Sequence, residues 1–295
     1  QTCALPICCY SQLRASQLAS IKGVDIVLGS REKFQVLHYL KEYNHRDDVT
    51  VEVGNIAADY HFVPSYSEND RTRTFLRVQD GCDYHCAYCT VPLARGRSRN
   101  PAVAEVVSEA KKITQTGVQE IVLTGVNVGD FGKSTGESFL QLISELERID
   151  EIARIRLSSI EPNLLNDRII DFVALSEKFM PHFHLPLQSG ADKVLKKMRR
   201  RYDGKLFAER IEKIRNTLPL AFIGVDVIVG FPGETDNDFS TTYHFLHDLD
   251  VSYLHVFPYS DRPGTTSFAM ADKTKASQIK ERAEKRPRKT VLRCP

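Results

Sequence analysis

The sequence predicts an α/β protein built around a partial (β/α)6 barrel. Two observations support this fold class. Short apolar segments alternate with segments of helical apolar spacing between residues 76 and 257, and polar residues follow the ends of the apolar segments. This alternation is typical of a parallel sheet whose strands are covered on both faces. Because a complete barrel of this type has eight units, six units leave an open side that can admit a large substrate.

The six predicted strands are short and apolar, and they cover residues 76–78, 121–126, 152–159, 183–187, 221–229 and 253–257. The predicted helices follow them at about 101–116, 139–149, 166–175, 191–198, 206–218 and 238–249. The first of these helices begins at Asn100 and Pro101, a capping side chain followed by a proline in the first turn, and it ends at Gly117.

Upstream of the barrel, residues 24–28 form a predicted strand, which a turn at Gly29 connects to an amphipathic helix that ends near Leu40. The polar stretch 64–73 then has the composition of a linker. We therefore expect two domains, residues 1–64 and residues 65–295, of which the second contains the barrel.

The composition is that of an ordinary globular protein, with 42% hydrophobic and 26% charged residues and a net charge of +2. No apolar run approaches the ~18 residues that span a bilayer, and no signal peptide is visible. We therefore expect a cytoplasmic protein with no membrane partner. In that compartment, cysteines are more often metal ligands or inert thiols than disulfides. A balanced net charge leaves room for a local basic patch that binds nucleic acid.

Polar residues cluster just beyond the carboxyl ends of the predicted strands. Because β/α barrels build their active sites at that face, we expect these residues to surround one site. They are Gly125 and Asn127, Ser159 and Glu161, Gln188 and Ser189, and Gly230 and Glu234.

The loop after the first barrel strand contains Cys82, Cys86 and Cys89 in the spacing C-x3-C-x2-C. Zinc usually takes four ligands, whereas thiolates also hold [4Fe-4S] clusters. Three ligands would leave one iron open to a substrate. The alternative is a zinc knuckle in which His85 is the fourth ligand.

The same spacing, with Tyr88 directly before the third cysteine, resembles the signature of the radical S-adenosylmethionine (SAM) superfamily, whose fold is a TIM-like partial barrel. The resemblance implies that Cys82, Cys86 and Cys89 hold a [4Fe-4S] cluster whose open iron binds SAM. It also implies that an external one-electron reductant drives the cleavage of SAM to methionine and a 5′-deoxyadenosyl radical.

Six longer stretches are similar to the methylthiotransferase branch of this superfamily, and the similarity is nearly continuous from residue 72 to about residue 270. Residues 124–130 and 158–162 most resemble the members that add a methylthio group to C2 of N6-threonylcarbamoyladenosine at position 37 of tRNA. Relatives that act on isopentenyladenosine in tRNA or on a ribosomal protein are alternatives, as is a non-enzymatic, zinc-stabilised RNA-binding module. The six stretches are residues 95–99, 123–130, 157–162, 182–190, 198–202 and 226–234.

In this family, the sulfur comes from an auxiliary [4Fe-4S] cluster held by three cysteines of the N-terminal domain. Only Cys9 matches one of those ligands, and most of that domain is missing, so residues 1–64 resemble a fragment of it. We therefore expect one cluster in this chain and two in an intact member. A chain without the auxiliary cluster would not complete the transfer of sulfur.

The resemblance implies that residues at the strand ends bind SAM, and each implied role has a structural alternative. Gly125 and Asn127 lie where the superfamily binds the SAM amino group, although a turn that closes a strand has the same composition. Ser159 and Glu161 would meet the ribose. Alternatively, Glu161 stabilises the N-terminus of a helix that begins at Pro162.

Further SAM contacts are implied for Gln188 and Ser189, which follow an apolar strand. Arg200 matches a Met-x-Arg-x-Tyr element in which an arginine pairs with the SAM carboxylate. The alternative for Arg200 is a solvated basic helix end. Tyr88 would pack on the SAM adenine, or else it is a core aromatic side chain.

Two clusters of basic residues near the barrel mouth could bind the phosphate backbone of an RNA. The alternative for both is a solvated charged face. His182 and His184 alternate on a strand and therefore share a face. They line the barrel interior or are satisfied core histidines. The basic clusters are Arg95, Arg97 and Arg99, and the cationic residues of 196–201.

Both ends of the sequence lack family character. The first seven residues match the translation of CAG ACG TGT GCT CTT CCG ATC, the end of a common sequencing adapter. We therefore expect residues 1–7 to be an assembly artefact, which resequencing of unamplified DNA tests, and Cys8 to replace a family glycine. Cys3 and Cys294 receive no role, and the small RNA-binding β-barrel that the family carries after the catalytic domain is not recognised in residues 286–295.

Overall fold

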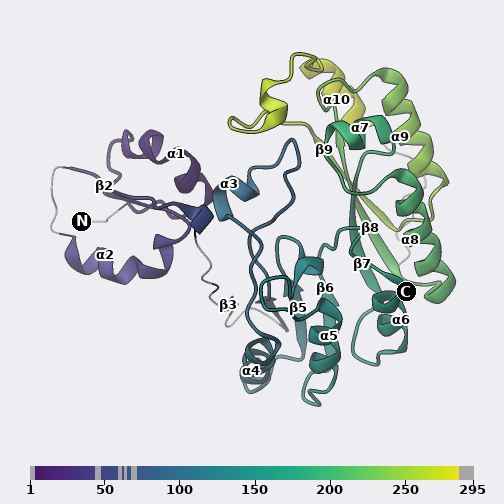
Figure 1. The fold of residues 1–295 in the computed structure, drawn as a ribbon, viewed down its shortest axis with the longest axis horizontal. Coiled ribbons are helices and arrows are strands. Elements are labelled where there is room, and N and C mark those ends of the chain that lie inside the picture. Colours follow the sequence, from purple (N-terminus) through teal and green to yellow (C-terminus); the bar gives the residue numbers. More distant parts are fainter. Residues whose placement is uncertain (1–3, 44–47, 59–61, 63–64, 68–71, 286–295) are drawn as a thin grey trace. The chain divides into compact units, whose positions relative to one another are not determined.

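A computed structural model describes the chain except for residues 1–3, 44–47, 59–61, 63–64, 68–71 and 286–295 (Figure 1). Cys3 and Cys294 lie outside the described residues. The chain divides into two compact units. The smaller comprises residues 1–61, 81–84 and 90–98, and the larger comprises residues 62–80, 85–89 and 99–295.

The smaller unit contains a two-stranded parallel sheet of β1 (Ile26–Leu28) and β2 (Thr50–Glu52). The predicted strand and the helix after it are present, although both are shorter than expected. Ala4 and Ile7 form parallel bridges with Val24 and Leu28 beside this sheet. The helical segments of the unit are α1 (Cys9–Ala19), η1 (Glu32–Gln35), α2 (Val36–Glu42), η2 (Ile56–Ala58) and α3 (Val91–Arg95).

The larger unit contains all six predicted barrel strands, in two sheets of order β3-β4-β5-β6 and β7-β8-β9. The six pair in parallel within each sheet, and the isolated bridges Ile155–Phe179 and Ser159–His184 lie where β6 gives way to β7. This is the partial α/β barrel that the sequence predicts. The strands are β4 (Arg73–Arg77), β5 (Glu120–Thr124), β6 (Arg154–Leu157), β7 (His182–Gln188), β8 (Phe222–Val229) and β9 (Tyr253–Pro258).

The polar stretch expected to be a linker holds one further strand. In β3 (Ser65–Tyr66), the two residues pair antiparallel with Arg77 and Leu76 of β4. Its composition hides the strand because an edge strand this short needs no apolar run.

Helices follow the strands, and capping side chains mark the starts of four of them. Ser138, Asn166, Asp203 and Thr235 each cap a helix through a side-chain oxygen. The helical segments are α4 (Val103–Thr114), η3 (Val128–Asp130), α5 (Phe139–Glu147), α6 (Asp167–Leu175), α7 (Asp192–Lys197), α8 (Gly204–Thr217), α9 (Asp236–Asp248), η4 (Thr266–Ala269) and α10 (Ala276–Glu284). Figure 1 shows α8 and α9 running beside β7–β9.

The expected start of α4 at Asn100 is wrong. The helix begins at Val103, whose N–H donates to the Glu137 carboxylate at 3.0 Å. The Asn100 side chain instead accepts the N–H of Gly132 at 3.0 Å and holds the loop before α5. A side chain from a distant loop therefore does the capping that a local residue was expected to do.

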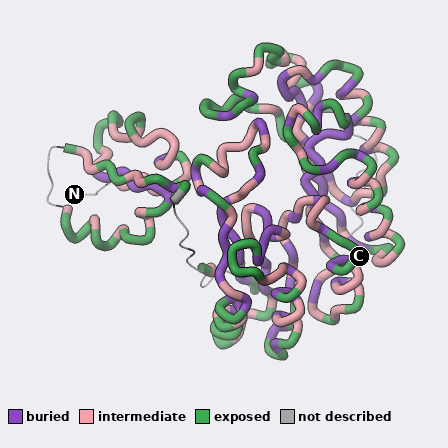
Figure 2. The backbone as a smooth tube through the Cα atoms, in the orientation of Figure 1, coloured by how far each residue is buried: buried purple, intermediate pink, exposed green. Residues whose placement is uncertain are grey.

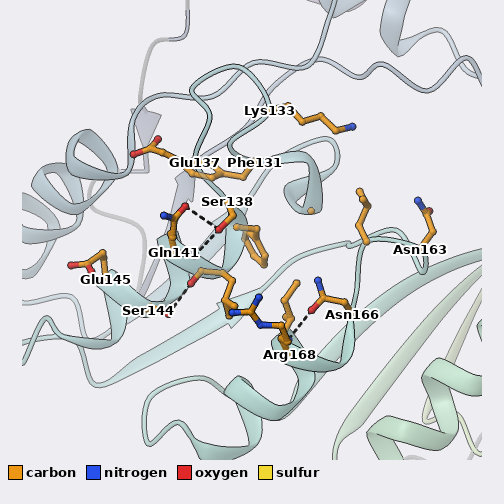
Figure 3. A pocket seen from close by; sticks show the side chains of 15 residues that line it. Phe131, Lys133, Glu137, Ser138, Gln141, Ser144, Glu145, Asn163, Asn166 and Arg168 are labelled. Atoms are coloured by element: carbon orange, nitrogen blue, oxygen red, sulfur yellow. Dashed lines mark hydrogen bonds between the residues drawn. The ribbon is translucent and has the colours of Figure 1, made fainter.

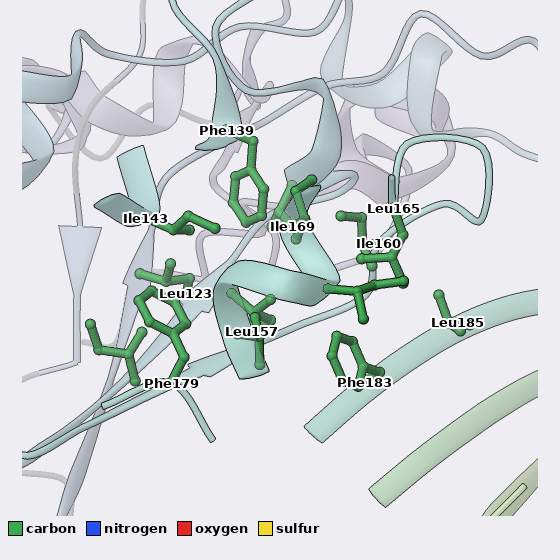
Figure 4. Close-up of a cluster of buried hydrophobic side chains, with 14 of the residues drawn as sticks. Leu123, Phe139, Ile143, Leu157, Ile160, Leu165, Ile169, Phe179, Phe183 and Leu185 are labelled. Atoms are coloured by element: carbon green, nitrogen blue, oxygen red, sulfur yellow. The ribbon is translucent and has the colours of Figure 1, made fainter. Parts of the chain in front are cut away.

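The main apolar core fills the space between the strands and their helices. Leu123, Leu157 and Phe183 are at most 1% exposed and meet α5 and α6 side chains such as Phe139 and Ile169 (Figure 4). Each side chain of this kind contributes ~1.5–3 kcal/mol when fully buried. Figure 2 shows the burial concentrated along the strands of the larger unit. Among the described residues, no helix is long and apolar enough to cross a membrane.

Candidate functional site

The boundary between the two units runs through the cysteine loop, with Cys82 in the smaller one. The N–H of Cys82 donates to the Gly96 carbonyl at 3.1 Å, and its Sγ accepts the N–H of Tyr84 at 3.4 Å. Gly81 precedes it with a φ of +68°, and a Cβ there would lie 2.0 Å from the Arg97 carbonyl oxygen. Only glycine therefore fits at the start of the loop.

Cys86 and Cys89 belong to the larger unit, and a backbone hydrogen bond of 3.1 Å joins them. Between them, the N–H of Ala87 donates to Met198, and its carbonyl accepts from Ser267 at 2.8 Å. Segments remote in sequence therefore hold this part of the loop. Within the described residues, Cys82, Cys86 and Cys89 form no disulfide.

Arg200 connects the cysteine loop to the strand ends. Its Nη1 donates to the Sγ of Cys86 at 3.0 Å and to the hydroxyl of Tyr88 at 3.2 Å, and its Nε donates to the hydroxyl of Tyr202 at 3.0 Å. Its Nη2 forms an ion pair with Glu161. Only 3% of the Arg200 side chain is exposed, so the alternative of a solvated helix end is wrong.

Burial dominates the electrostatics around this arginine. It raises the pKa of the Cys86 thiol and of the Glu161 carboxyl, although the Arg200 guanidinium opposes both shifts. It also raises the pKa of Tyr88 and Tyr202, so both phenols stay protonated and available as donors. The group leaves a permanent positive charge beside a cysteine sulfur.

The alternative role of Glu161 as a helix cap is also wrong. No helix begins at Pro162, because residues 162–164 form a turn and α6 begins at Asp167. Tyr88 packs edge-on against Phe231 with ring centroids 6.4 Å apart, within a small apolar cluster that includes Met198.

The turn after β5 depends on Gln79, which the sequence analysis did not single out. Its Oε1 accepts the N–H of Val126 at 2.9 Å and that of Asn127 at 2.8 Å, and a Cβ on Gly125 would lie 2.9 Å from it. The Asn127 side chain is buried, and its amide atoms have no hydrogen-bond partner among the described residues. Gln79 had one available signal, since it is a polar residue just past an apolar strand.

The remaining strand-end residues differ in their burial and in their hydrogen-bond partners. The Ser159 hydroxyl bonds Nδ1 of His184, so this histidine has polar partners. Gln188 has a φ of +67° at an irregularity of β7. The hydroxyl of Ser189 is fully buried and bonds the hydroxyl of Thr242 at 3.1 Å, so it is used inside the protein.

The expectation that Arg99 contacts RNA is wrong. Its side chain is 5% exposed and pairs with the buried carboxylate of Asp80 at 3.1 Å. Arg97 is 65% exposed and pairs with Asp83, while the Nε of Arg95 donates to the Sγ of Cys9 at 3.2 Å within the smaller unit.

The structure also contains a pocket of about 710 Å³ between α5, η3 and α6 (Figure 3). Lys133, Glu137, Asn163 and Arg168 line it, and none of the predicted SAM-binding residues does. The predicted site therefore lies elsewhere in the larger unit, around Arg200.

Comparison with known proteins agrees with this geometry. A family model described as the radical SAM superfamily matches residues 76–246. Among solved structures, the radical SAM methyltransferase TsrM from Kitasatospora setae, with tryptophan substrate and a SAM analogue bound, superimposes with a TM-score of 0.55 at 18% identity, covering 77% of this chain and 42% of that one. A likeness at this identity establishes the fold.

Two curated relatives are more similar in sequence. The threonylcarbamoyladenosine tRNA methylthiotransferase MtaB of Bacillus subtilis (strain 168) is 40% identical over 283 residues, which cover 94% of this chain and 62% of that protein. The protein of the same name from Aquifex aeolicus (strain VF5) is 38% identical over 289 residues, which cover 97% and 68%. The chain thus spans about two thirds of the length of these relatives, and it belongs to the methylthiotransferase family of the radical SAM superfamily.

Proposed function

We propose that this chain is the catalytic core of an enzyme that transfers a methylthio group to C2 of N6-threonylcarbamoyladenosine at position 37 of tRNA. The similarity to the two MtaB proteins supports this substrate. The main structural support for the proposal is that Arg200 contacts Cys86, Tyr88 and Glu161. These contacts bring a predicted cluster ligand and predicted SAM-binding residues together at the carboxyl ends of the strands.

The donor set fits a [4Fe-4S] cluster on Cys82, Cys86 and Cys89. None of the three forms a disulfide within the described residues, and the Sγ atoms of Cys82 and Cys86 each accept an N–H hydrogen bond. Such bonds stabilise cluster sulfurs and tune their potential. The zinc alternative is less well supported, because its fourth ligand, His85, is an exposed side chain.

SAM would bind beside this loop. The buried, unpartnered amide of Asn127 and the turn at Gly125 suit its amino acid part, and Ser159, Glu161, Tyr88 and Gln188 would surround its nucleoside. Arg200 would hold Glu161 and Cys86 in place and balance negative charge. When bound, the cluster and SAM supply a 5′-deoxyadenosyl radical, which can remove the unactivated hydrogen at C2 of adenine.

Further proposals concern the rest of the enzyme. Residues 65–295 form the radical SAM domain, and residues 1–64 belong to a separate N-terminal domain. Cys9 alone represents the auxiliary cluster, so this chain holds one cluster. The partners are tRNA and an external one-electron reductant, and the location is the cytoplasm.

Anaerobic reconstitution followed by iron, sulfide and zinc analysis tests the cofactor. About four irons per chain, with 5′-deoxyadenosine formed from SAM and dithionite, is the expected result. Replacing Cys82, Cys86 and Cys89 together with alanine abolishes both, whereas Cys9→Ala leaves both intact. About eight irons would contradict the single cluster, and zinc without iron would favour the RNA-binding module.

The substrate is tested in cells. Deletion of the intact gene should remove the methylthio group from N6-threonylcarbamoyladenosine in tRNA digests. Loss of the group from isopentenyladenosine or from a ribosomal peptide would instead support one of the alternative substrates.

A further inference from the structure

Three neighbouring strands of the larger unit bring polar side chains together on one face. His184 of β7 contacts Asp226 of β8 through Nε2 at 2.9 Å, and His255 of β9 contacts the same Oδ1 atom through Nδ1 at 3.2 Å. The hydroxyl of Ser159 bonds the other nitrogen of His184. We call His184, Asp226 and His255 the His–Asp cluster.

The His–Asp cluster lies on the face of the sheet that looks into the barrel. The residues that alternate with it, Leu185, Val225 and Leu254, belong to the core beneath the helices. A closed barrel fills its interior with bulky apolar side chains. Here the interior face is polar and open, with 25% of His184, 17% of Asp226 and 48% of His255 exposed.

The hydrogen bonds within the cluster determine which of its atoms remain available to a ligand. An ionised Asp226 accepts from both imidazoles, so His184 carries its proton on Nε2 and accepts from Ser159 through Nδ1. The second oxygen of Asp226 and Nε2 of His255 then remain as acceptors. The cluster therefore suits a ligand that presents several N–H and O–H donors.

Aromatic rings flank these acceptors. The ring of Tyr253 lies edge-on to His255 at 4.5 Å, and that of Phe257 lies at 6.0 Å on the other side. Phe257 is 49% exposed, which is unusual for a phenylalanine on an inner barrel face. Exposed rings next to hydrogen-bonding groups are the combination that holds an unstacked base.

We propose that the His–Asp cluster and these rings bind the target nucleoside of the RNA substrate. The inference rests on the proposed function and extends it. The N6-threonylcarbamoyl group adds a carbamoyl N–H and a hydroxyl that an unmodified adenosine or an isopentenyl group lacks, and these donors, not its carboxylate, would face Asp226. A site that hydrogen-bonds such donors rejects analogues without them, because acceptors that the bound nucleoside closes off from water would stay unpaired.

A divalent metal ion is the competing occupant, since the ligand atoms of His184, Asp226 and His255 lie within 4.8 Å of one another. The nucleoside is favoured because the three groups already satisfy one another by hydrogen bonds. An ion held by the three groups would have to replace both histidine–aspartate hydrogen bonds, with each imidazole shifted to its other tautomer. It would also give no role to the half-buried ring of Tyr253 and the exposed ring of Phe257.

Binding of short RNA stem–loops tests the inference. The reconstituted full chain, with SAM, is titrated with stem–loops that carry N6-threonylcarbamoyladenosine, isopentenyladenosine or adenosine at the same position. Asp226→Asn and His255→Gln should each lower the preference for the threonylcarbamoyl RNA at least ~10-fold. His255 is half exposed, so its variant should fold even if the other does not.

His247 and Asp248 provide a matched control, because they form a histidine–aspartate pair at 3.1 Å on the outer helix α9. His247→Gln and Asp248→Asn should leave the preference unchanged. If the wild type prefers the threonylcarbamoyl RNA and both cluster variants keep that preference, the inference fails while the proposed function stands.

If the wild-type chain shows no preference, the proposed substrate fails and the inference falls with it. Titration of the same samples with zinc or cobalt tests whether a metal ion occupies the site instead. Stoichiometric metal binding that Asp226→Asn and His255→Gln abolish, and that the α9 control variants retain, would overturn the nucleoside assignment in favour of a metal site.

Discussion

Arg200 donates a hydrogen bond from Nη1 to the Sγ of Cys86 over 3.0 Å. Its other guanidinium nitrogen pairs with Glu161, which lies just past β6. One buried cation therefore fixes a cysteine of the loop relative to the barrel. Geometry of this kind must exist before a cluster binds if the cluster is to be placed accurately against a substrate.

Arg200→Met should destabilise the chain by ~3–5 kcal/mol, because it leaves the Glu161 carboxylate buried without its partner. Adding Glu161→Gln should recover at least half of that loss. Urea unfolding of the cluster-free chain measures both. Arg148→Met removes an exposed pair with Glu145 and should cost under ~0.5 kcal/mol. Equal losses for Arg200→Met and Arg148→Met would show that the buried pair has no structural importance.

Gln79→Leu should weaken SAM binding roughly 10-fold and lower the unfolding free energy by ~1–3 kcal/mol per lost hydrogen bond. Leucine fills the space but leaves the N–H groups of Val126 and Asn127 without an acceptor. Equilibrium SAM binding and urea unfolding are the measurements. Gln115→Leu, at the exposed end of α4, should change neither quantity. Wild-type SAM affinity in Gln79→Leu would mean that this turn does not bind SAM.

Much of the fold follows from the sequence because local patterns determine it. The strands and helices of the barrel are apolar segments between capping residues such as Asn166 and Asp203, and periodicity is enough to locate them. The three-cysteine spacing likewise identifies the loop. What the pattern does not reveal is pairing between segments that are distant in the chain.

Three misread residues illustrate that limit. Arg99 looked like part of a basic surface, but it is buried and pairs with Asp80, to which it is bridged antiparallel across the cysteine loop. Asn100 looked like a helix cap, but it bonds the loop at Gly132. Gln79 looked unremarkable, but it accepts two N–H groups from the turn after β5. In each case the partner is fixed by the tertiary fold and not by neighbouring residues.

The packing of α10 against β8 supplies a third prediction. Arg282 donates to the buried Glu234 carboxylate at 2.6 Å, and a Cβ on Gly230 would lie 2.4 Å from Cγ1 of Ile279. Arg282→Met and Gly230→Ala should each detach the helix. Hydrogen exchange should then rise by at least ~10-fold at the amides of α10 and stay unchanged in α4. Uniform acceleration across the unit would point to global destabilisation instead.

His182 makes the stability of the chain depend on pH. Burial lowers its pKa from 6.5 to about 4, and its ring stacks on Phe222 with centroids 5.2 Å apart. Because the folded pKa lies below the unfolded value, the unfolded state takes up the proton first. Stability is therefore lost as the pH falls from 6.5 towards 4, by about 3 kcal/mol in total.

His182→Phe should remove that part of the pH dependence, since phenylalanine keeps a ring against Phe222 and has no proton to bind. Unfolding free energies at pH 7, 6, 5 and 4.5 compare the variant with the wild type. The two curves should converge or cross as the pH falls, with the variant flatter below pH 6.5. His247→Gln, an exposed histidine on α9, should reproduce the wild-type slope. If His182→Phe keeps that slope as well, another group titrates in this range and His182 is protonated in the folded chain without penalty.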